Sequence, residues 1–207
     1  GRVVVTTDMA VEGRHFRTDW SEPEDIGHRV AAANLADIAA MGARPTGLVV
    51  ALALPGSTSV AWVTSLMTGI VEEAASAGAS VIGGDITAGD TIVVSISALG
   101  DLAGGEPVLR SGVEVGDVIA VAGRLGWAAA GLAVLGRGFR SPRALVDAYR
   151  RPAPAYVAAR AAADAGADLK VRVVLIARGL SEVWQQIGVE HEDIGAVMNS
   201  TEGQFDI

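Results

Sequence analysis

Runs of β-branched and aliphatic residues alternate along this chain with longer, alanine-rich segments of helical period, and this alternation limits the possible folds more than any other feature. Strands are expected over 2–7, 46–55, 79–86, 90–102 and 113–123, and helices over 21–42, 58–77, 126–136, 142–150 and 154–166. Half of the residues are hydrophobic but only 4% are aromatic, so Ala, Val, Leu and Ile must form the core. The pattern indicates an α/β or α+β fold.

The helix over 21–42 has recognisable start and stop signals. Ser21 is followed three residues later by Glu24, which is the spacing of a capping box. Gly42 suits the position just after a helix, and Pro45 follows it. We therefore expect Ser21 to cap this helix and Gly42 to end it.

The pattern becomes irregular after Ala167. Residues 168–177 are strand-like and 180–188 form a short helix or turn, but the remainder has no clear period. About forty residues are too few for an independent domain without additional stabilisation. We expect two domains, 1–112 and 113–207. Either the tail of the second docks on the first, or the second is an abridged, incomplete α/β domain.

Charge and residue usage exclude several classes of protein. The formal net charge is −8 and no basic run occurs, which argues against an extended nucleic-acid partner. The absence of cysteine excludes disulfides, thiolate zinc sites and cysteine nucleophiles. The basic residues are 15 Arg and a single Lys, Lys170. Any phosphate must therefore be bound by arginine, a metal ion or backbone N–H groups.

The most apolar window, 118–136, contains Arg124, four glycines and a change from strand to helix pattern. We interpret it as buried core and not as a membrane span. No signal peptide is visible before the first strand. We expect a cytoplasmic protein that does not bind a membrane.

Three aspartates have apolar or small neighbours. Asp8 and Asp85 are each expected at the end of a strand, and Asp37 in the middle of the alanine-rich helix. A buried, unpaired carboxylate is costly, so each needs an arginine, backbone donors or a metal ion. Each could instead cap a helix or close a turn. Their shared surroundings favour a Mg²⁺ site, to which Thr6 and Thr7 would add hydroxyl oxygens.

Candidate phosphate and substrate contacts lie near these acids. Glycines such as Gly84 would let the backbone approach a phosphate beside Asp85. His15 follows Asp8 in a glycine-containing loop, and Arg110 precedes a turn. Either could bind substrate, or could be an ordinary surface residue. The P-loop, the dinucleotide fingerprint, a Ser-His-Asp candidate and the H-E-x-x-H zinc motif are missing.

Four segments, in this order, closely resemble the thiamine-monophosphate kinases of the aminoimidazole ribonucleotide synthetase superfamily: TTDMAVEGRHF, NLADIAAMGARP, GGDITAGD and RSGVEVGDVIAVAGRLGWAAAGLAVL. The resemblance covers about residues 2–166, and VEGRHF separates these kinases from their superfamily relatives. It implies transfer of the γ-phosphate of ATP to thiamine monophosphate, giving thiamine diphosphate and ADP. It also implies an N-terminal domain whose strands, flanked by helices, form a β-barrel across a homodimer interface, with ATP and Mg²⁺ nearby.

The resemblance also implies roles for individual residues. The implied metal ligands are Thr6, Thr7, Asp8, Asp37 and Asp85, and the three aspartates would also be catalytic. The implied ATP contacts are Gly84, Asp85 and Arg110. The implied substrate contacts are His15 and Phe205. The family's GDDAA-, DVSDGL- and GGEDH-type motifs are absent from this sequence. Two alternatives stay open: another ATP-dependent enzyme of the superfamily, and a nucleotide-binding dimer without catalytic activity.

Overall fold

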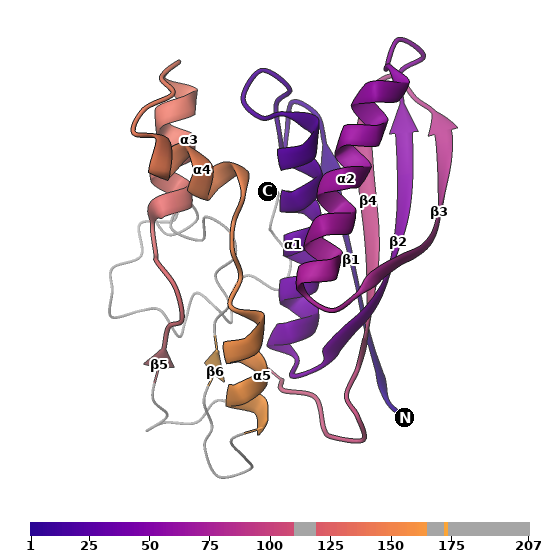
Figure 1. Ribbon diagram of the computed structural model, residues 1–207, viewed down its shortest axis with the longest axis vertical. Helices are drawn as coiled ribbons and strands as arrows, with labels where there is room; N and C mark the ends of the chain where they lie inside the picture. Colours follow the sequence, from indigo (N-terminus) through magenta and orange to yellow (C-terminus); the bar gives the residue numbers. More distant parts are fainter. Residues whose placement is uncertain (110–118, 165–171, 174–207) are drawn as a thin grey trace.

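The protein is described by a computed structural model that covers residues 1–109, 119–164 and 172–173 (Figure 1). Its elements are β1 (Val3–Val11), α1 (Pro23–Ala40), β2 (Arg44–Leu54), α2 (Val60–Ser76), β3 (Ser80–Ala88), β4 (Val93–Asp101), β5 (Ile119–Ala120), α3 (Trp127–Gly136), α4 (Arg143–Arg150), α5 (Tyr156–Asp164) and β6 (Arg172–Val173). This order confirms the mixed α/β class.

Strands β1 to β4 form one open sheet with the order β1-β4-β2-β3. Strand β4 is antiparallel to both β1 and β2, whereas β2 and β3 are parallel and are connected through α2. The two edges of the sheet, β1 and β3, do not pair with each other, so the described strands do not close into a barrel (Figure 1). Strand β1 extends beyond the expected 2–7 because its pairing with β4 continues to Val11.

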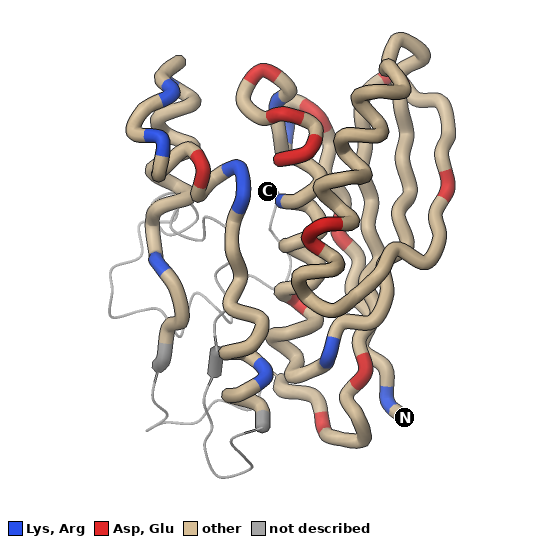
Figure 2. The backbone as a smooth tube through the Cα atoms, viewed as in Figure 1, with Lys and Arg blue, Asp and Glu red and all other residues tan. Residues whose placement is uncertain are grey.

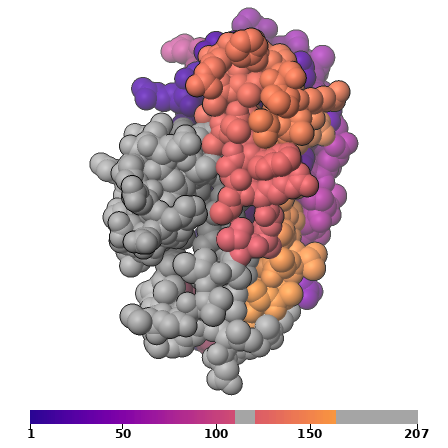
Figure 3. All heavy atoms as spheres, turned by 90° about the vertical axis from the view of Figure 1, so that its left-hand side faces the viewer, coloured from indigo at the N-terminus to yellow at the C-terminus, as the bar shows by residue number. Residues whose placement is uncertain are grey.

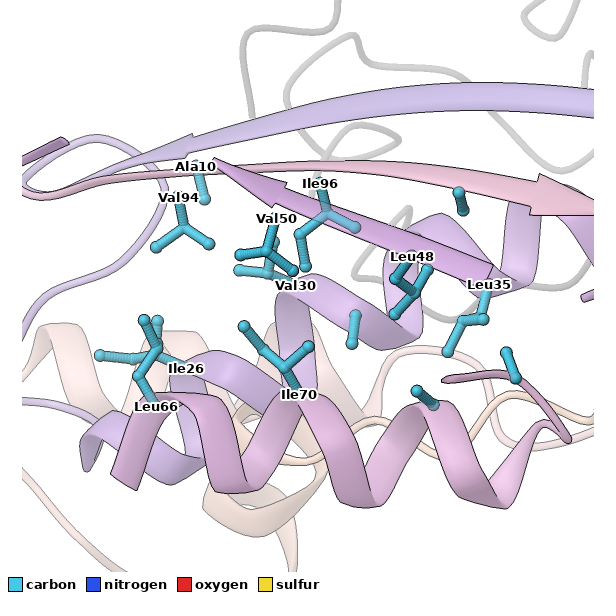
Figure 4. Close-up of a cluster of buried hydrophobic side chains, with 14 of the residues drawn as sticks. Ala10, Ile26, Val30, Leu35, Leu48, Val50, Leu66, Ile70, Val94 and Ile96 are labelled. Carbon is cyan, nitrogen blue, oxygen red and sulfur yellow. The ribbon is translucent and has the colours of Figure 1, made fainter. Parts of the chain in front are cut away.

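Helices α1 and α2 cover one face of this sheet, and the main core lies between the helices and the strands (Figure 4). Alternate residues of β4, namely Val94, Ile96 and Ala98, are fully buried there. Ile26 of α1 and Ile70 of α2 pack against them from the helical side. Each such aliphatic side chain contributes about 1.5–3 kcal/mol by leaving water.

Among the residues that the structure describes, no helix covers the opposite face of the sheet. Its apolar side chains include Val3, Val5 and Met9 of β1, which are 61%, 62% and 59% exposed, and Val49 of β2, which is 38% exposed. We call this surface the open face.

Two glycines allow α1 and α2 to cross in direct backbone contact. A Cβ atom on Gly27 would lie 2.0 Å from the carbonyl oxygen of Leu66, and one on Gly69 would lie 2.0 Å from that of Glu24. Atoms cannot approach so closely, so any larger residue at either position must push the helices apart.

Helix α1 begins one residue later than expected. Its N-cap is Glu22, which has extended backbone angles and makes no side-chain capping bond, so the prediction that Ser21 is the cap was wrong. The reason is Pro23, because a residue before proline is disfavoured in helical conformation. Gly42 ends the helix as expected, with a positive φ of 75° and its N–H bonded to the carbonyl of Ala39.

Helices α3 and α4 pack as a pair around a second small cluster formed by Leu135, Val146 and Tyr149. They lie with α5 along one side of the molecule (Figure 3). The helices expected over 126–136, 142–150 and 154–166 are thus confirmed within one or two residues at each end. Most of the strand expected over 113–123, and the predicted domain boundary after residue 112, lie outside the described residues.

The apolar window 118–136 is divided between β5 and α3, as its change of pattern indicated. Helix α3 takes only the ten residues Trp127–Gly136 of it. Within the described parts of the chain, no helix is both long enough and apolar enough to cross a membrane.

Buried polar contacts attach α5 to the first two helices. Glu73 of α2 is only 5% exposed, accepts a hydrogen bond from the hydroxyl of Tyr156, and lies 2.8 Å from Nε2 of His28 on α1. Burial, together with this bond to the Glu73 carboxylate, raises the pKa of Tyr156 above its ordinary value. The neutral phenol is therefore the form that the folded protein stabilises.

A second set of polar contacts joins the end of α4 to the start of α1. Figure 2 shows the basic and acidic positions along the backbone in these two regions. Arg151 donates to Asp25 at 2.6 Å and also pairs with Glu24. These two hydrogen bonds raise the pKa of the Arg151 guanidinium, and the bond to Asp25 has the larger effect. Acidic residues in the first turn of α1 also interact favourably with its helix dipole.

We predict that Gly69→Ala destabilises the protein by about 1–3 kcal/mol, because the added methyl group overpacks the crossing of α1 and α2. Gly136→Ala is a matched control, since nothing lies within 4 Å of a Cβ atom at that position. Its free energy of unfolding should stay within about 1 kcal/mol of wild type. Urea denaturation measures both. Equal stability of the two variants would contradict the close helix contact.

We predict that Tyr156→Phe lowers the free energy of unfolding at pH 7 by about 1–3 kcal/mol, because the buried carboxylate of Glu73 loses a donor. The raised pKa of Tyr156 means that its contribution is complete below the unfolded tyrosine pKa of about 10 and declines above it. Wild type should therefore lose stability more steeply than Tyr156→Phe between pH 9 and 11.

Tyr149→Phe is the control for this prediction, because it removes the hydroxyl of the chain's other tyrosine. Thermal and urea denaturation of the three proteins across this pH range would provide the comparison. A wild type and a Tyr156→Phe variant with parallel pH profiles would refute the proposed role of the phenol.

Candidate functional site

The alternation of side chains along β1 separates the residues expected to bind a metal ion. Thr6 and Asp8 pair with Ala98 and Ile96 of β4, both buried, so their side chains lie on the helix-covered face. Thr7 lies on the open face, where its hydroxyl is 2.8 Å from that of Ser97. The three expected ligands of β1 therefore do not share one side of the sheet.

Asp37 of α1 lies beside Thr6. The hydroxyl of Thr6 donates to Oδ2 of Asp37 at 3.3 Å, across 31 residues of sequence. The expectation of an embedded acid was wrong, because the Asp37 side chain is exposed while its neighbours Ala36 and Ile38 are buried. The Asp37 side chain thus contacts Thr6 and is still exposed to solvent, so its charge remains hydrated.

Asp8 is not at the end of a strand, as expected, but within β1, and it is half-buried. It is two residues from Thr6 on the same face, a separation of about 7 Å along a strand. Asp8 is thus the next residue along this face of β1, and Asp37 contacts Thr6 from α1. Such oxygen donors suit Mg²⁺, which commonly uses one or two carboxylates and keeps several water ligands.

Asp85 lies apart from this group. It is within β3, at the opposite edge of the sheet, and not at a strand end as expected. Its register partner is Ala51, an exposed residue between buried Val50 and Leu52, so the Asp85 side chain is on the open face. Two strands separate β3 from β1, which corresponds to roughly 14 Å.

Gly84, beside Asp85, has a clear structural role. A Cβ atom there would lie 2.0 Å from the carbonyl oxygen of Val50 on β2. The glycine expected in a phosphate-binding turn instead lies within strand β3 and permits its close pairing with β2. Among the described residues, no group of three or more acidic or histidine side chains is positioned to hold one metal ion.

His15 and Asp8 line the same small pocket, of about 40 Å³. His15 is half-buried in the loop after β1, and its Nδ1 accepts a hydrogen bond of 2.9 Å from the backbone N–H of Val11. In the neutral imidazole the proton is therefore on Nε2. The expected substrate contact and one expected metal ligand are thus brought together.

Two polar residues that sequence reasoning missed also line this pocket, Ser21 and Arg29. Ser21 is 6% exposed, and Arg29 stacks on the ring of Tyr149, with its Cζ 4.1 Å from the ring centroid. No local signal in the sequence identifies Arg29, because its environment depends on Tyr149 of α4.

The loop between His15 and α1 is held by arginines. Arg17 pairs with Asp19, and this hydrogen bond lowers the pKa of the Asp19 carboxyl. Arg140 donates to the backbone carbonyl of Asp19, and Arg150 to that of Trp20. The region around α4 therefore fixes one wall of the pocket. The expected contacts Arg110 and Phe205 lie outside the described residues.

The chain is similar in sequence and in fold to known proteins. Residues 1–102 match the family "AIR synthase related protein, N-terminal domain". The chain is 46% identical over 173 residues to a protein of Mycobacterium tuberculosis named thiamine-monophosphate kinase, an alignment that covers 84% of this chain and 52% of the relative. The chain spans about half the length of the curated relatives it matches.

Two solved structures show the same fold. A ThiL protein in complex with AMPPCP and TMP is 28% identical, with a TM-score of 0.70 over 77% of this chain and 52% of that one. The thiamine-monophosphate kinase of Stenotrophomonas maltophilia is 30% identical, with a TM-score of 0.67 and the same coverage of both chains. Residues 1–102 therefore belong to the family of AIR synthase related N-terminal domains, and the chain is a relative of the thiamine-monophosphate kinases.

Proposed function

We propose that the protein catalyses ATP-dependent phosphorylation of thiamine monophosphate to thiamine diphosphate. The observation that carries this proposal is the 46% identity, over 84% of the chain, to a relative with that name. The similar ThiL structure with AMPPCP and TMP supports it, because an ATP analogue and an acceptor are held there together. The contact between Thr6 and Asp37, and the pocket shared by Asp8 and His15, supply groups that this chemistry needs.

The reaction is an in-line transfer. An oxygen of the acceptor phosphate bonds to the γ-phosphorus, the bond from that phosphorus to the β–γ bridging oxygen breaks, and ADP leaves with the electron pair. Both reactants are anionic, and the protein itself carries a net charge of −8. Positioning and charge neutralisation therefore matter more than proton transfer.

Mg²⁺ would supply most of this neutralisation. We propose that Asp8 and Asp37 hold it on the helix-covered side of β1, with Thr6 between them. Thr7 could contribute only backbone atoms to such a site, since its hydroxyl is on the open face with Ser97. Gly84, Asp85 and Arg110 are proposed to contact the nucleotide, with Asp85 acting on the open face.

We further propose that two copies of the chain pair through their open faces and so complete a barrel. Exposed β1 side chains such as Val5 and Met9 support this, because a large apolar surface on a sheet marks an interaction site. In such a dimer Asp85, which is also on the open face, would lie at the interface. We place residues 1–112 in this dimerising and nucleotide-binding unit, 113–207 in a second unit, and the reaction in the cytoplasm, where ATP is available.

We predict that wild type releases ADP only when ATP, Mg²⁺ and thiamine monophosphate are all present, and that Asp37→Asn lowers kcat by about 100-fold or more. Asp37 is exposed, so the substitution should leave the fold intact. Glu72→Gln is the control, because it removes one negative charge from an exposed helix position on α2. A coupled ADP-release assay measures all three proteins.

Unchanged turnover in Asp37→Asn would contradict the proposal that Asp37 binds Mg²⁺. A wild type that uses another acceptor in place of thiamine monophosphate would favour a different enzyme of the superfamily. Binding of Mg–ATP without any turnover would favour the non-catalytic dimer.

We predict that Val5→Lys converts a dimeric wild type into a monomer, because it places a charge in the centre of the proposed interface. Val71→Lys, on an exposed position of α2, should leave the dimer intact. Size-exclusion chromatography with light scattering gives the masses. A wild type with the mass of one chain, or a Val5→Lys variant that stays dimeric, would rule out pairing through the open face.

A further inference from the structure

Arg29 lines the pocket shared by Asp8 and His15, and one nitrogen of its guanidinium has no hydrogen-bond partner among the described residues. Its Nη1 atom is buried, yet it makes no hydrogen bond with any residue that the structure describes. Arginine cannot lose its charge, and a buried donor without an acceptor is costly. A bound group that accepts hydrogen bonds would remove this cost.

Tyr149 holds the Arg29 side chain in place. The guanidinium stacks on the Tyr149 ring at 4.1 Å, and this ring is only 5% exposed because it packs with Leu135 and Val146 between α3 and α4. A guanidinium already fixed on an aromatic ring loses little further freedom when it binds a ligand. Arg29 is thus ordered before binding.

The other groups at the pocket define what it can accept. Ser21 contributes a hydroxyl, and His15 carries its proton on Nε2 when neutral, since Nδ1 is occupied by the N–H of Val11. Asp8 is the single acidic side chain among the lining residues. An arginine accompanied by neutral donors matches the oxygens of a phosphate, to which guanidinium can donate two parallel bonds.

The size of the pocket limits which part of a ligand it can hold. Its volume of about 40 Å³ corresponds to roughly three water molecules at 10–15 Å³ each. This space suits the phosphate end of a ligand. The rest of the ligand would extend outside the pocket.

We propose that this pocket binds the phosphate of the acceptor substrate and that Arg29 is its main hydrogen-bond donor. The identification of that substrate as thiamine monophosphate rests on the proposed function. The acceptor phosphate would then lie beside Asp8, which is also the proposed Mg²⁺ ligand, so one pocket would hold the attacking oxygen next to the metal. Arg29 would orient this phosphate without taking part in proton transfer.

Calorimetric titration of the whole chain tests this inference without requiring turnover. The ligands are thiamine monophosphate, thiamine and inorganic phosphate, and the variants are Arg29→Met, Arg29→Lys and the control Arg137→Met, an exposed arginine after α3. Arg29→Met should weaken thiamine monophosphate binding about 10- to 100-fold and leave thiamine binding unchanged. Arg29→Lys should give a smaller loss, and Arg137→Met none.

The outcomes separate this inference from the proposed function. Unchanged affinity of Arg29→Met for thiamine monophosphate, or an equal loss for thiamine, would overturn the phosphate contact. If wild type binds inorganic phosphate but not thiamine monophosphate, and Arg29→Met abolishes that binding, the anion site stands and the proposed substrate is wrong. If wild type binds neither inorganic phosphate nor thiamine monophosphate, both the phosphate site and the proposed substrate are wrong. Thermal unfolding shows whether each variant is folded. If Arg29→Met does not fold, the affinity of Arg29→Lys for thiamine monophosphate tests the phosphate contact.

Discussion

The backbone contact between α1 and α2 is the constraint on which the rest of the structure depends. Gly27 and Gly69 let the helices cross with no side chain between them, so α1 is held at a fixed distance from its neighbour. Helix α1 carries Arg29 and Asp37, and it contacts β1, which carries Thr6 and Asp8. A shift of α1 would therefore move one half of the candidate site relative to the other half.

Polar contacts then attach the C-terminal helices to α1. Glu73 joins His28 and Tyr156 in the interior, and Arg151 joins the acidic first turn of α1. Alongside these contacts, Tyr149 of α4 stacks against Arg29, which lines the small pocket. The residues that line the pocket all lie between Asp8 and Val30, and α4 acts on the pocket through its contacts with Arg29 and with the loop before α1.

Much of the fold could be predicted from the sequence because it depends on local signals. Helix α2, strand β2 and the end of α1 at Gly42 follow from hydrophobic period and from a glycine with positive φ. The start of α1 was misassigned because the proline restriction on Glu22 outweighs the capping-box spacing at Ser21. This was a local rule that the sequence contained.

The arrangement of the candidate site was harder to predict from the sequence, because it depends on strand register and tertiary packing. Motifs singled out Thr6, Asp8, Asp37 and His15, and the structure brings them together in two pairs: Thr6 contacts Asp37, and Asp8 and His15 line one pocket. Motifs could not show that Thr7 and Asp85 are on the open face, since a shift of one residue in register reverses the side of a strand. Nor could they distinguish Arg29, whose environment is made by a helix more than a hundred residues away.

Transfer of the terminal phosphoryl group of ATP to thiamine monophosphate is the central claim, and isotopic labelling tests it most directly. The protein would be incubated with Mg²⁺, thiamine monophosphate and ATP labelled with ¹⁸O in the γ-phosphoryl group, and the products identified by mass spectrometry. We predict thiamine diphosphate that carries the label in its terminal phosphate, formed only with Mg²⁺ present. Release of labelled inorganic phosphate with no labelled thiamine diphosphate would contradict the account.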